Sequence, residues 1–152
     1  MKKIFFIILL NFLLINKTYA LIEVDITRGN LDPLPIAVSP LHVDINSQEL
    51  KDIKIKELGE NISKIIENNF RGTGLFNPLK KDAFVQKPDI AHLKPRFEDW
   101  RLIKAQALVT GKLLVKGGKL KIEFRLWDLA AAQEMTALAF TTTPSNWRRV
   151  AH

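Results

Sequence analysis

Apolar and polar side chains alternate with a period of two in the last third of the chain. The alternation runs through residues 107–116 and 119–126, and a Gly117-Gly118 pair joins the two stretches. Alternation of this kind gives each strand one apolar face, and a two-residue glycine link is typical of a tight β-hairpin turn. A third alternating stretch, residues 136–140, follows a run of turn residues. The pattern predicts a hairpin extended by a third antiparallel strand.

From Asp52 onward the spacing of apolar residues changes to that of a helix. Side chains three, four, seven and eight positions apart share one face of an α-helix, so this stripe predicts a long amphipathic helix packed on a sheet. Ser47 or Asp52 is placed to cap its start, and Gly72 is placed to end it. The stripe consists of Leu58, Ile62, Ile65, Ile66 and Phe70.

Shorter elements lie around that helix. Residues 34–38 alternate as a strand, which Pro40 ends or places at a sheet edge. Leu75-Phe76 reads as a short strand that leaves the glycine-rich end of the helix, and residues 97–103 favour a helical turn. Near the end of the chain, Ser145 is placed as the N-cap of a last helix. The chain therefore mixes strands with helices.

The first twenty residues have the pattern of an export signal. Lys2 and Lys3 precede an apolar run over residues 4–15, and a small residue, Ala20, stands at the expected cleavage position. The apolar run is shorter than the roughly 20 residues that a membrane-spanning helix needs. We expect a secretory signal peptide over residues 1–20, cleaved near Ala20.

The stretch that follows the signal alternates again. Apolar residues at 22, 24 and 26 face one way and Glu23, Asp25 and Thr27 the other, and the turn-rich residues 28–33 separate this stretch from the next strand. Two interpretations stay open. The stretch is either the first strand of the sheet or a separate strand that another protein captures.

Composition limits the chemistry. The chain has 152 residues, a formal charge of +7 and no cysteine. Three of its lysines lie in the export signal, so the mature chain is only mildly basic. A chain of this length is typical of one domain with its own core. The lack of cysteine excludes disulfides and thiolate metal sites.

No pattern of catalytic, metal-binding or cofactor-binding residues is apparent. The histidines, His42, His92 and His152, are not spaced as metal ligands, and we interpret them as isolated surface or loop residues. There is no G-x-S-x-G sequence, and the "RGTGLF" stretch lacks the strand–turn–helix context of a phosphate-binding loop. We therefore predict no enzyme activity, no metal site and no cofactor.

One basic stripe is a weak candidate for nucleic-acid binding. Lys119, Lys121 and Arg125 share a face of the hairpin, with Trp127 as a candidate stacking ring. Known modules of this kind carry more aromatic residues and more charge, and this chain has an export signal. The favoured alternative is a water-facing sheet surface whose lysines protect it from aggregation.

Several stretches together resemble one known family. These are "PIAVSPL", "FRGTGLFNPL", "ALVTGKLLVKGGKLKIEFRLWD" and the closing "WRRVAH". In their order and spacing they resemble the amino-terminal domain of the TolB family, the periplasmic component of the Tol-Pal envelope system. The resemblance implies an α/β (α+β) domain with helices packed on a mixed β-sheet, similar to anticodon-binding domains. In the family a β-propeller follows, but nothing here reads as propeller blades, and we expect the chain to end inside the last helix of the first domain.

The resemblance also implies a function and a division of the chain. Residues 1–20 are the signal, residues 21–33 a partner-binding segment, and residues 34–152 the domain. The implied partner is the carboxyl-terminal domain of TolA, with Pal bound mainly through the propeller of full-length relatives. The implied location is the periplasm, peripheral to the membranes, in support of outer-membrane integrity and cell division. The residues implied to bind TolA are Leu21, Ile22, Glu23, Val24, Asp25, Ile26 and Thr27.

Two alternatives remain beside this interpretation. One is a periplasmic envelope-assembly or stress factor with the same domain but no Tol partner. The other, disfavoured, is the nucleic-acid-binding module. Neither alternative requires a cofactor.

Overall fold

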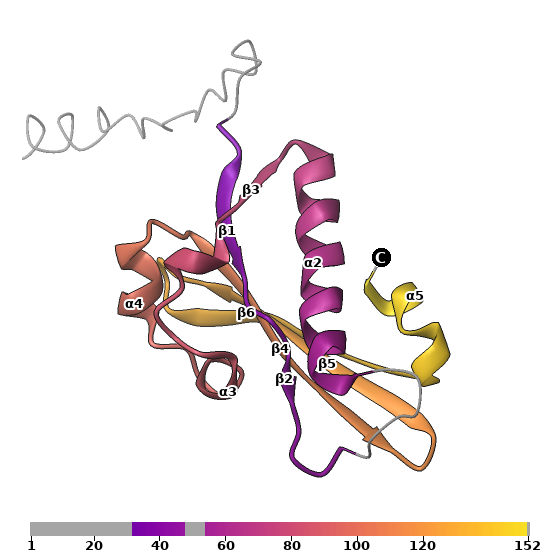
Figure 1. The fold of residues 1–152 in the computed structure, drawn as a ribbon. Helices are drawn as coiled ribbons and strands as arrows, with labels where there is room; N and C mark the ends of the chain where they lie inside the picture. Colours follow the sequence, from indigo (N-terminus) through magenta and orange to yellow (C-terminus); the bar gives the residue numbers. More distant parts are fainter. Residues whose placement is uncertain (1–31, 48–53, 152) are drawn as a thin grey trace, which may run out of the picture. The chain divides into compact units, whose positions relative to one another are not determined.

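The computed structural model describes residues 32–47 and 54–151, which lie in one compact unit (Figure 1). Within these ranges six strands form one mixed sheet, with the order β3-β1-β4-β5-β6 and β2 beside β4. The first strand is parallel to both of its neighbours, and the last three are antiparallel. The strands are β1 (Leu34–Val38), β2 (His42–Val43), β3 (Phe76–Pro78), β4 (Ala107–Lys116), β5 (Lys119–Asp128) and β6 (Gln133–Thr142). This confirms the predicted mixed sheet of an α+β domain.

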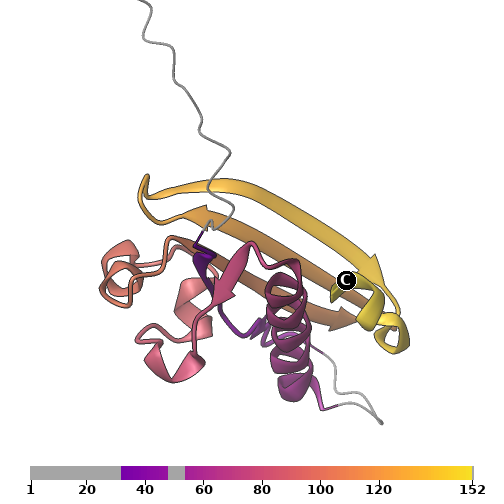
Figure 2. The same ribbon diagram turned by 90° about the horizontal axis from the view of Figure 1, so that it is seen from above.

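The helices are α2 (Ile55–Thr73), α3 (Pro88–Ala91), α4 (Phe97–Leu102) and α5 (Arg148–Ala151), with short 3₁₀ turns over Lys81–Ala83 and Pro144–Asn146. Figure 1 shows α2 and α5 on one side of the sheet and α3 and α4 on the other. The long strands β5 and β6 lie side by side along the border of the sheet (Figure 2). Helices therefore cover both faces of one sheet.

The predicted hairpin and third strand are confirmed. Gly117 and Gly118 both have positive φ, 58° and 71°, which is the conformation that a two-residue turn of this type requires. The register pairs Val115 of β4 with Leu120 of β5, and it pairs Ile122 of β5 with Phe140 of β6. The alternating apolar positions thus form continuous rows across β4, β5 and β6.

The long helix is confirmed, but its ends differ from the prediction. It begins at Ile55 without a side-chain cap, while Ser47 accepts a hydrogen bond at its Oγ from the Val115 backbone N–H (3.3 Å). Asp52 lies outside the described residues. The helix ends at Thr73 and is capped by Gly74, whose φ is 70°, so the prediction for Gly72 is wrong. Gly74 takes the left-handed conformation that closes the last turn and leads into β3.

The edge-strand alternative for β1 is also wrong. Pro40 lies beyond the end of the strand, and β1 has hydrogen-bonded neighbours on both sides. The last helix also starts later than predicted. Ser145 lies inside a 3₁₀ turn, and α5 starts at Arg148, after the buried ring of Trp147.

Alternation along the strands divides the core between the two faces. On the α2 side, Leu113, Ile122 and their neighbours pack against the apolar stripe of the helix. On the opposite side, Leu108 and Trp127 pack with Trp100 of α4. The strands β1, β4 and β5 therefore supply buried residues to both layers.

Leu41 lies between α2 and the sheet. Its backbone N–H donates to the Gly59 carbonyl of the helix (3.3 Å). A Cβ atom on Gly59 would lie 2.5 Å from the Leu41 carbonyl oxygen. One on Gly111 of β4 would lie 2.3 Å from the Glu123 carbonyl oxygen of β5 and 3.3 Å from Leu41 Cγ. Both glycines therefore provide room for this crossing segment.

Candidate functional site

The predicted partner-binding segment, Leu21–Thr27, lies outside the described residues. What the structure does describe is the sheet that follows it. Its inner strands β1, β4 and β5 each pair on both sides with strands drawn from residues 34–142. The interior of this sheet is therefore complete without a further strand.

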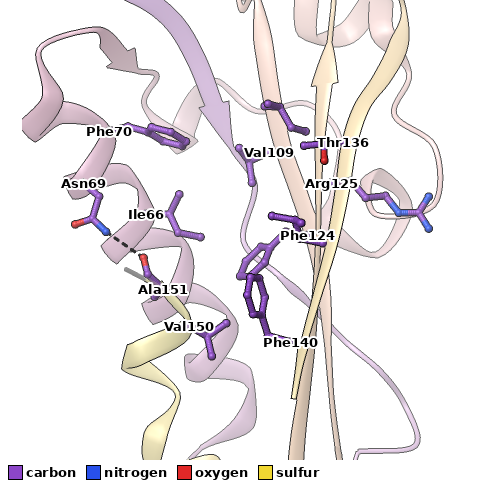
Figure 3. Close-up of a pocket in the computed structure, with 12 residues that line it drawn as sticks. Ile66, Asn69, Phe70, Val109, Phe124, Arg125, Thr136, Phe140, Val150 and Ala151 are labelled. Atoms are coloured by element: carbon purple, nitrogen blue, oxygen red, sulfur yellow. Dashed lines mark hydrogen bonds between the residues drawn. The ribbon is translucent and has the colours of Figure 1, made fainter. Parts of the chain in front are cut away.

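An apolar groove lies between α2, α5 and the last three strands (Figure 3). Its volume is about 370 Å³, within the range of small ligand pockets. Aromatic rings from three elements border it, and Phe124 and Phe140 meet edge to face with their ring centroids 6.1 Å apart. The lining residues are Ile66, Asn69, Phe70, Val109, Phe124, Arg125, Leu126, Thr136, Leu138, Phe140, Val150 and Ala151.

The polar side chains at the groove form hydrogen bonds and ion pairs within the protein. Asn69 donates through Nδ2 to the Ala151 carbonyl (3.0 Å), which ties α5 to α2 (Figure 3). Arg125 forms an ion pair with Glu134 (3.4 Å). The lining contains no pair of acid and base groups poised for proton transfer. The groove is thus suited to apolar contact.

The groove stays open because β6 is the outermost strand. Leu138 is 55% exposed and Phe140 is 41% exposed, although both lie on the face that carries α2. The alternating pattern of residues 136–140 signalled an apolar face here. It gave no sign that this face would be left partly uncovered.

The opposite face is built around two tryptophans. The Trp100 indole N–H donates to Gln86 Oε1 (2.9 Å), which also accepts from the Arg96 backbone N–H (2.9 Å). Trp127 donates from Nε1 to Thr110 Oγ1 (2.8 Å). All polar atoms in these three bonds lie at partly or fully buried sites, where an unmade bond is costly.

Burial of Trp127 removes the candidate stacking ring for nucleic acid. The side chain is only 6% exposed and packs edge to face on Phe97. Lys121 is paired with Glu123 (2.7 Å), and the hydrogen bond from Lys121 is the main cause that lowers the pKa of the Glu123 carboxyl. Burial of Trp127 therefore contradicts the disfavoured stacking role, and the stripe fits the favoured alternative of a charged, water-facing surface.

His42 and His92 lie together, contrary to the prediction of isolated histidines. Their rings stack with centroids 4.1 Å apart and planes 3° apart, which joins β2 to the end of α3. Burial, followed by the charge of His92, lowers the pKa of His42. The spacing of 50 positions along the chain carried no signal of this contact.

Residues 32–47 and 54–151 contain no group of three His, Cys, Asp or Glu side chains arranged to hold a metal ion. None of the helices in this part of the chain is both long and apolar enough to cross a membrane. His152 falls outside the described residues.

Comparison with known proteins adds to this picture. A family model described as the TolB amino-terminal domain matches residues 22–135. A curated relative, the "Tol-Pal system protein TolB" of Pelagibacter ubique (strain HTCC1062), is 66% identical over 138 residues. That match covers 90% of this chain and 31% of the relative. The chain thus spans about a third of the length of this relative.

Solved structures share the fold at low sequence identity. TolB from Acinetobacter baumannii superposes with a TM-score of 0.60 at 16% identity, covering 79% of this chain and 26% of that one. The E. coli LpoB structure superposes with a TM-score of 0.54 at 8% identity, covering 73% of this chain and 58% of that one. At these identities the likeness speaks for the fold alone.

Proposed function

This chain belongs to the TolB amino-terminal domain family, and we propose on that basis that it is a non-enzymatic, protein-binding component of the Tol-Pal system. The single observation that carries the proposal is the 66% identity to a Tol-Pal system protein over 90% of the chain. The apolar groove, with no reactive constellation in its lining, supports a binding role over a catalytic one. In this role the protein supports outer-membrane integrity and cell division.

The proposed location is the periplasm. Residues 1–20 have the charged start, apolar run and small terminal residue of a secretory signal, cleaved near Ala20. Fractionation of cells followed by amino-terminal sequencing tests this. We expect the periplasmic fraction to hold a chain that starts at Leu21. A chain that stays in the cytoplasm with Met1 intact would contradict the proposed location.

The proposed partner is the carboxyl-terminal domain of TolA, which Leu21–Thr27 joins as an added strand. Ordering about six residues costs about 6 to 12 kcal/mol of conformational free energy. Burial of Ile22, Val24 and Ile26 returns about 5 to 9 kcal/mol, and ladder hydrogen bonds add about 0.5 to 1.5 kcal/mol each. These terms nearly cancel. A segment in such balance is suited to capture by the edge of another sheet.

The completeness of the described sheet supports this role. Its interior positions are filled by strands from residues 34–142, so the sheet does not need Leu21–Thr27 as an inner strand. Glu23 and Asp25 would sit on the face opposite the apolar residues of the added strand. Their charges would select the partner more than they would strengthen binding.

A deletion separates a binding segment from a structural one. Removal of Leu21–Thr27 should abolish binding to the purified TolA domain in calorimetry while the melting temperature stays within a few degrees of wild type. A collapse of the melting temperature would show that the segment is a structural strand. In that case the proposed binding role fails.

A single substitution tests strand addition more finely. Val24→Pro removes one backbone donor from the added ladder, so affinity for the TolA domain should fall at least tenfold. The matched control is Arg28→Pro, in the turn-rich stretch after the segment, which should bind as wild type does. Equal affinity of wild type and Val24→Pro would contradict strand addition.

Binding to Pal is expected to depend on another part of the family's architecture. The resemblance assigns that contact mainly to the propeller of full-length relatives, and this chain spans 31% of the length of the curated relative. We therefore expect residues 21–152 by themselves to suffice for binding the TolA domain, while Pal is bound through the propeller in relatives that carry one. Calorimetry of these residues with the purified TolA domain tests the first expectation.

A further inference from the structure

The outer side of β6 is a long open sheet edge. β6 has ten residues and stands last in the strand order. Of the strands that the structure describes, β5 alone pairs with it. An unpaired edge presents a row of backbone N–H and C=O groups that can pair with another strand.

This edge lacks the features that usually block such pairing. Residues 135–143 contain no charged side chain, no proline and no glycine. The charged residue that directly precedes this stretch in the sequence, Glu134, forms an ion pair with Arg125 of β5 (3.4 Å). Edge strands of monomeric proteins are usually protected by lysine, proline or a bulge in the middle of the strand. The one irregularity of β6 lies near its start, opposite Leu126 and Trp127.

We propose that β6 is a self-association surface, on which β6 of a second copy of this chain pairs antiparallel about a two-fold axis at Ala139. Antiparallel pairing of one strand with itself is isologous, so each contact occurs twice. This register makes the uncharged residues 135–143 of one copy face the same residues of the other. It also sets Leu138 of each copy opposite Phe140 of its partner on the groove face, and aliphatic–aromatic pairs of this kind stabilise sheets.

Charge favours a second copy over an acidic strand as the occupant. An acidic strand would need unpaired cations along this edge. Lys121 is already held by Glu123 (2.7 Å) and Arg125 by Glu134 (3.4 Å). A second copy brings a neutral strand and needs no such cations.

The same pairing covers apolar surface that the monomer exposes. Leu138 and Phe140 are half exposed in the monomer and lie at the border of the groove. One pair of strand edges is a small interface beside the 1,200 to 2,000 Å² that is roughly typical of stable complexes. The expected dimer is therefore reversible, and its dissociation constant falls in the micromolar range.

Sedimentation of the purified protein over a concentration series tests the proposal. The wild type should shift from monomer to dimer as concentration rises, and its melting temperature should rise in parallel. Ala139→Glu and Ala139→Lys each place two like charges opposite each other at the axis, so each variant alone should associate at least tenfold more weakly. An equimolar mixture of the two variants should recover dimer, because opposite charges then meet.

Leu102→Lys is the matched control, since Leu102 is exposed on α4, a helix on the side of the sheet opposite α2 (Figure 1). This control should dimerise as wild type does. Circular dichroism of each variant confirms that the fold is kept. Association that the Ala139 variants do not weaken, or a mixture that does not recover dimer, would overturn the proposed register and surface.

Hydrogen exchange distinguishes a second copy from another segment of the same chain as the occupant of the β6 edge. In the proposed dimer, amides on the outer side of β6 become protected as concentration rises. If the protein is monomeric at every concentration and these amides are nevertheless protected, another segment of the same chain covers the edge. If it is monomeric and they exchange freely, the edge is unoccupied. Either result rules out the second copy.

Discussion

The face of the sheet that packs on α3 and α4 encloses two tryptophans, whereas the face that packs on α2 and α5 opens into a groove beside β6. On the first face, hydrogen bonds fix each indole: Trp100 to Gln86 and Trp127 to Thr110. On the second face, burial decreases from β5 to β6. Ile122 is fully buried, but its cross-strand partner Phe140 is 41% exposed.

The difference shows two ways in which a face of a sheet can be covered. Short helices and loops can close a face when large rings fill the space and their polar atoms find partners. A long helix covers only the strands beneath it, because its width is about 10 to 12 Å and strands lie about 4.8 Å apart. The outermost strand then needs a second element or a partner to cover it. The four measurements that follow test this contrast between a closed and an open face.

The largest effect is expected in the middle of the closed face. Trp100 is 1% exposed, so Trp100→Ala leaves a large cavity and should lower the free energy of unfolding by about 3 to 5 kcal/mol. Leu102→Ala on the same helix removes a side chain that is 79% exposed and should change stability by less than about 0.5 kcal/mol. Urea unfolding measures both. Similar losses for the two variants would mean that α4 is not part of the core.

The next effect concerns the buried hydrogen bond of Trp127. Trp127→Phe keeps a ring but leaves the Thr110 hydroxyl without its donor, so the free energy of unfolding should fall by about 1 to 3 kcal/mol. Thr110→Val removes the acceptor and should cost a similar amount. The double variant should lose less than the sum of the two, since neither group then lacks a partner. Strict additivity would show that the bond contributes nothing.

A smaller effect is expected at the open face. Phe140→Ala should lower the free energy of unfolding by about 1 kcal/mol, because much of the ring already contacts water. Its partner in the register, Ile122, is fully buried, and Ile122→Ala should cost about 2 to 5 kcal/mol. Measurement at low protein concentration keeps self-association from adding to either value. Equal losses would show that β6 belongs to the core as fully as β5 does.

The smallest effect is that of pH on the closed side, where α3 meets β2 through His42 and His92. Burial lowers the pKa of His42, so between its folded value and about 6.5 the unfolded chain binds more protons than the folded one. Stability is therefore highest above that range and decreases as pH falls through it. Asp89 and Asp44 oppose the shift, whereas Lys112 adds to it.

The matched variant for this measurement is His42→Gln, which keeps a polar group and removes the titration. Thermal melts from about pH 7 to about pH 5 should show a smaller decrease for the variant than for wild type. Both proteins should still lose stability well below that range. There Asp44 and Glu123, whose pKa values are lowered mainly by hydrogen bonds to Asn46 and Lys121, take up protons. Identical profiles between about pH 7 and about pH 5 would mean that His42 titrates alike in the folded and unfolded states.

The strands and the long helix were predictable from local patterns. Gly117-Gly118 and the alternation on either side of it determine the hairpin, and the stripe from Leu58 to Phe70 determines α2. The end of that helix was placed wrongly because Gly72 and Gly74 are both glycines near its last turn. The choice between them depends on where the chain must turn to enter β3.

Contacts between distant segments were not predictable in the same way. Nothing near His42 in the sequence indicates that His92 stacks on it. Likewise, the alternation that placed Trp127 among charged residues did not indicate that Trp127 is buried in one cluster with Trp100. The sequence pattern predicted only part of the groove. Its apolar residues follow from the pattern, while its openness depends on how far α2 and α5 extend over β6.

The passage of Leu41 between α2 and β4 sets a requirement on any chain with this fold. Both positions that adjoin it, Gly59 and Gly111, have no space for a side chain. A side chain at Gly59 would press on the backbone of Leu41, whereas one at Gly111 would press first on the Glu123 carbonyl of the neighbouring strand. We therefore expect natural variants to keep glycine at position 111 whatever residue stands at position 41, and to change Gly59 only together with the segment around Leu41.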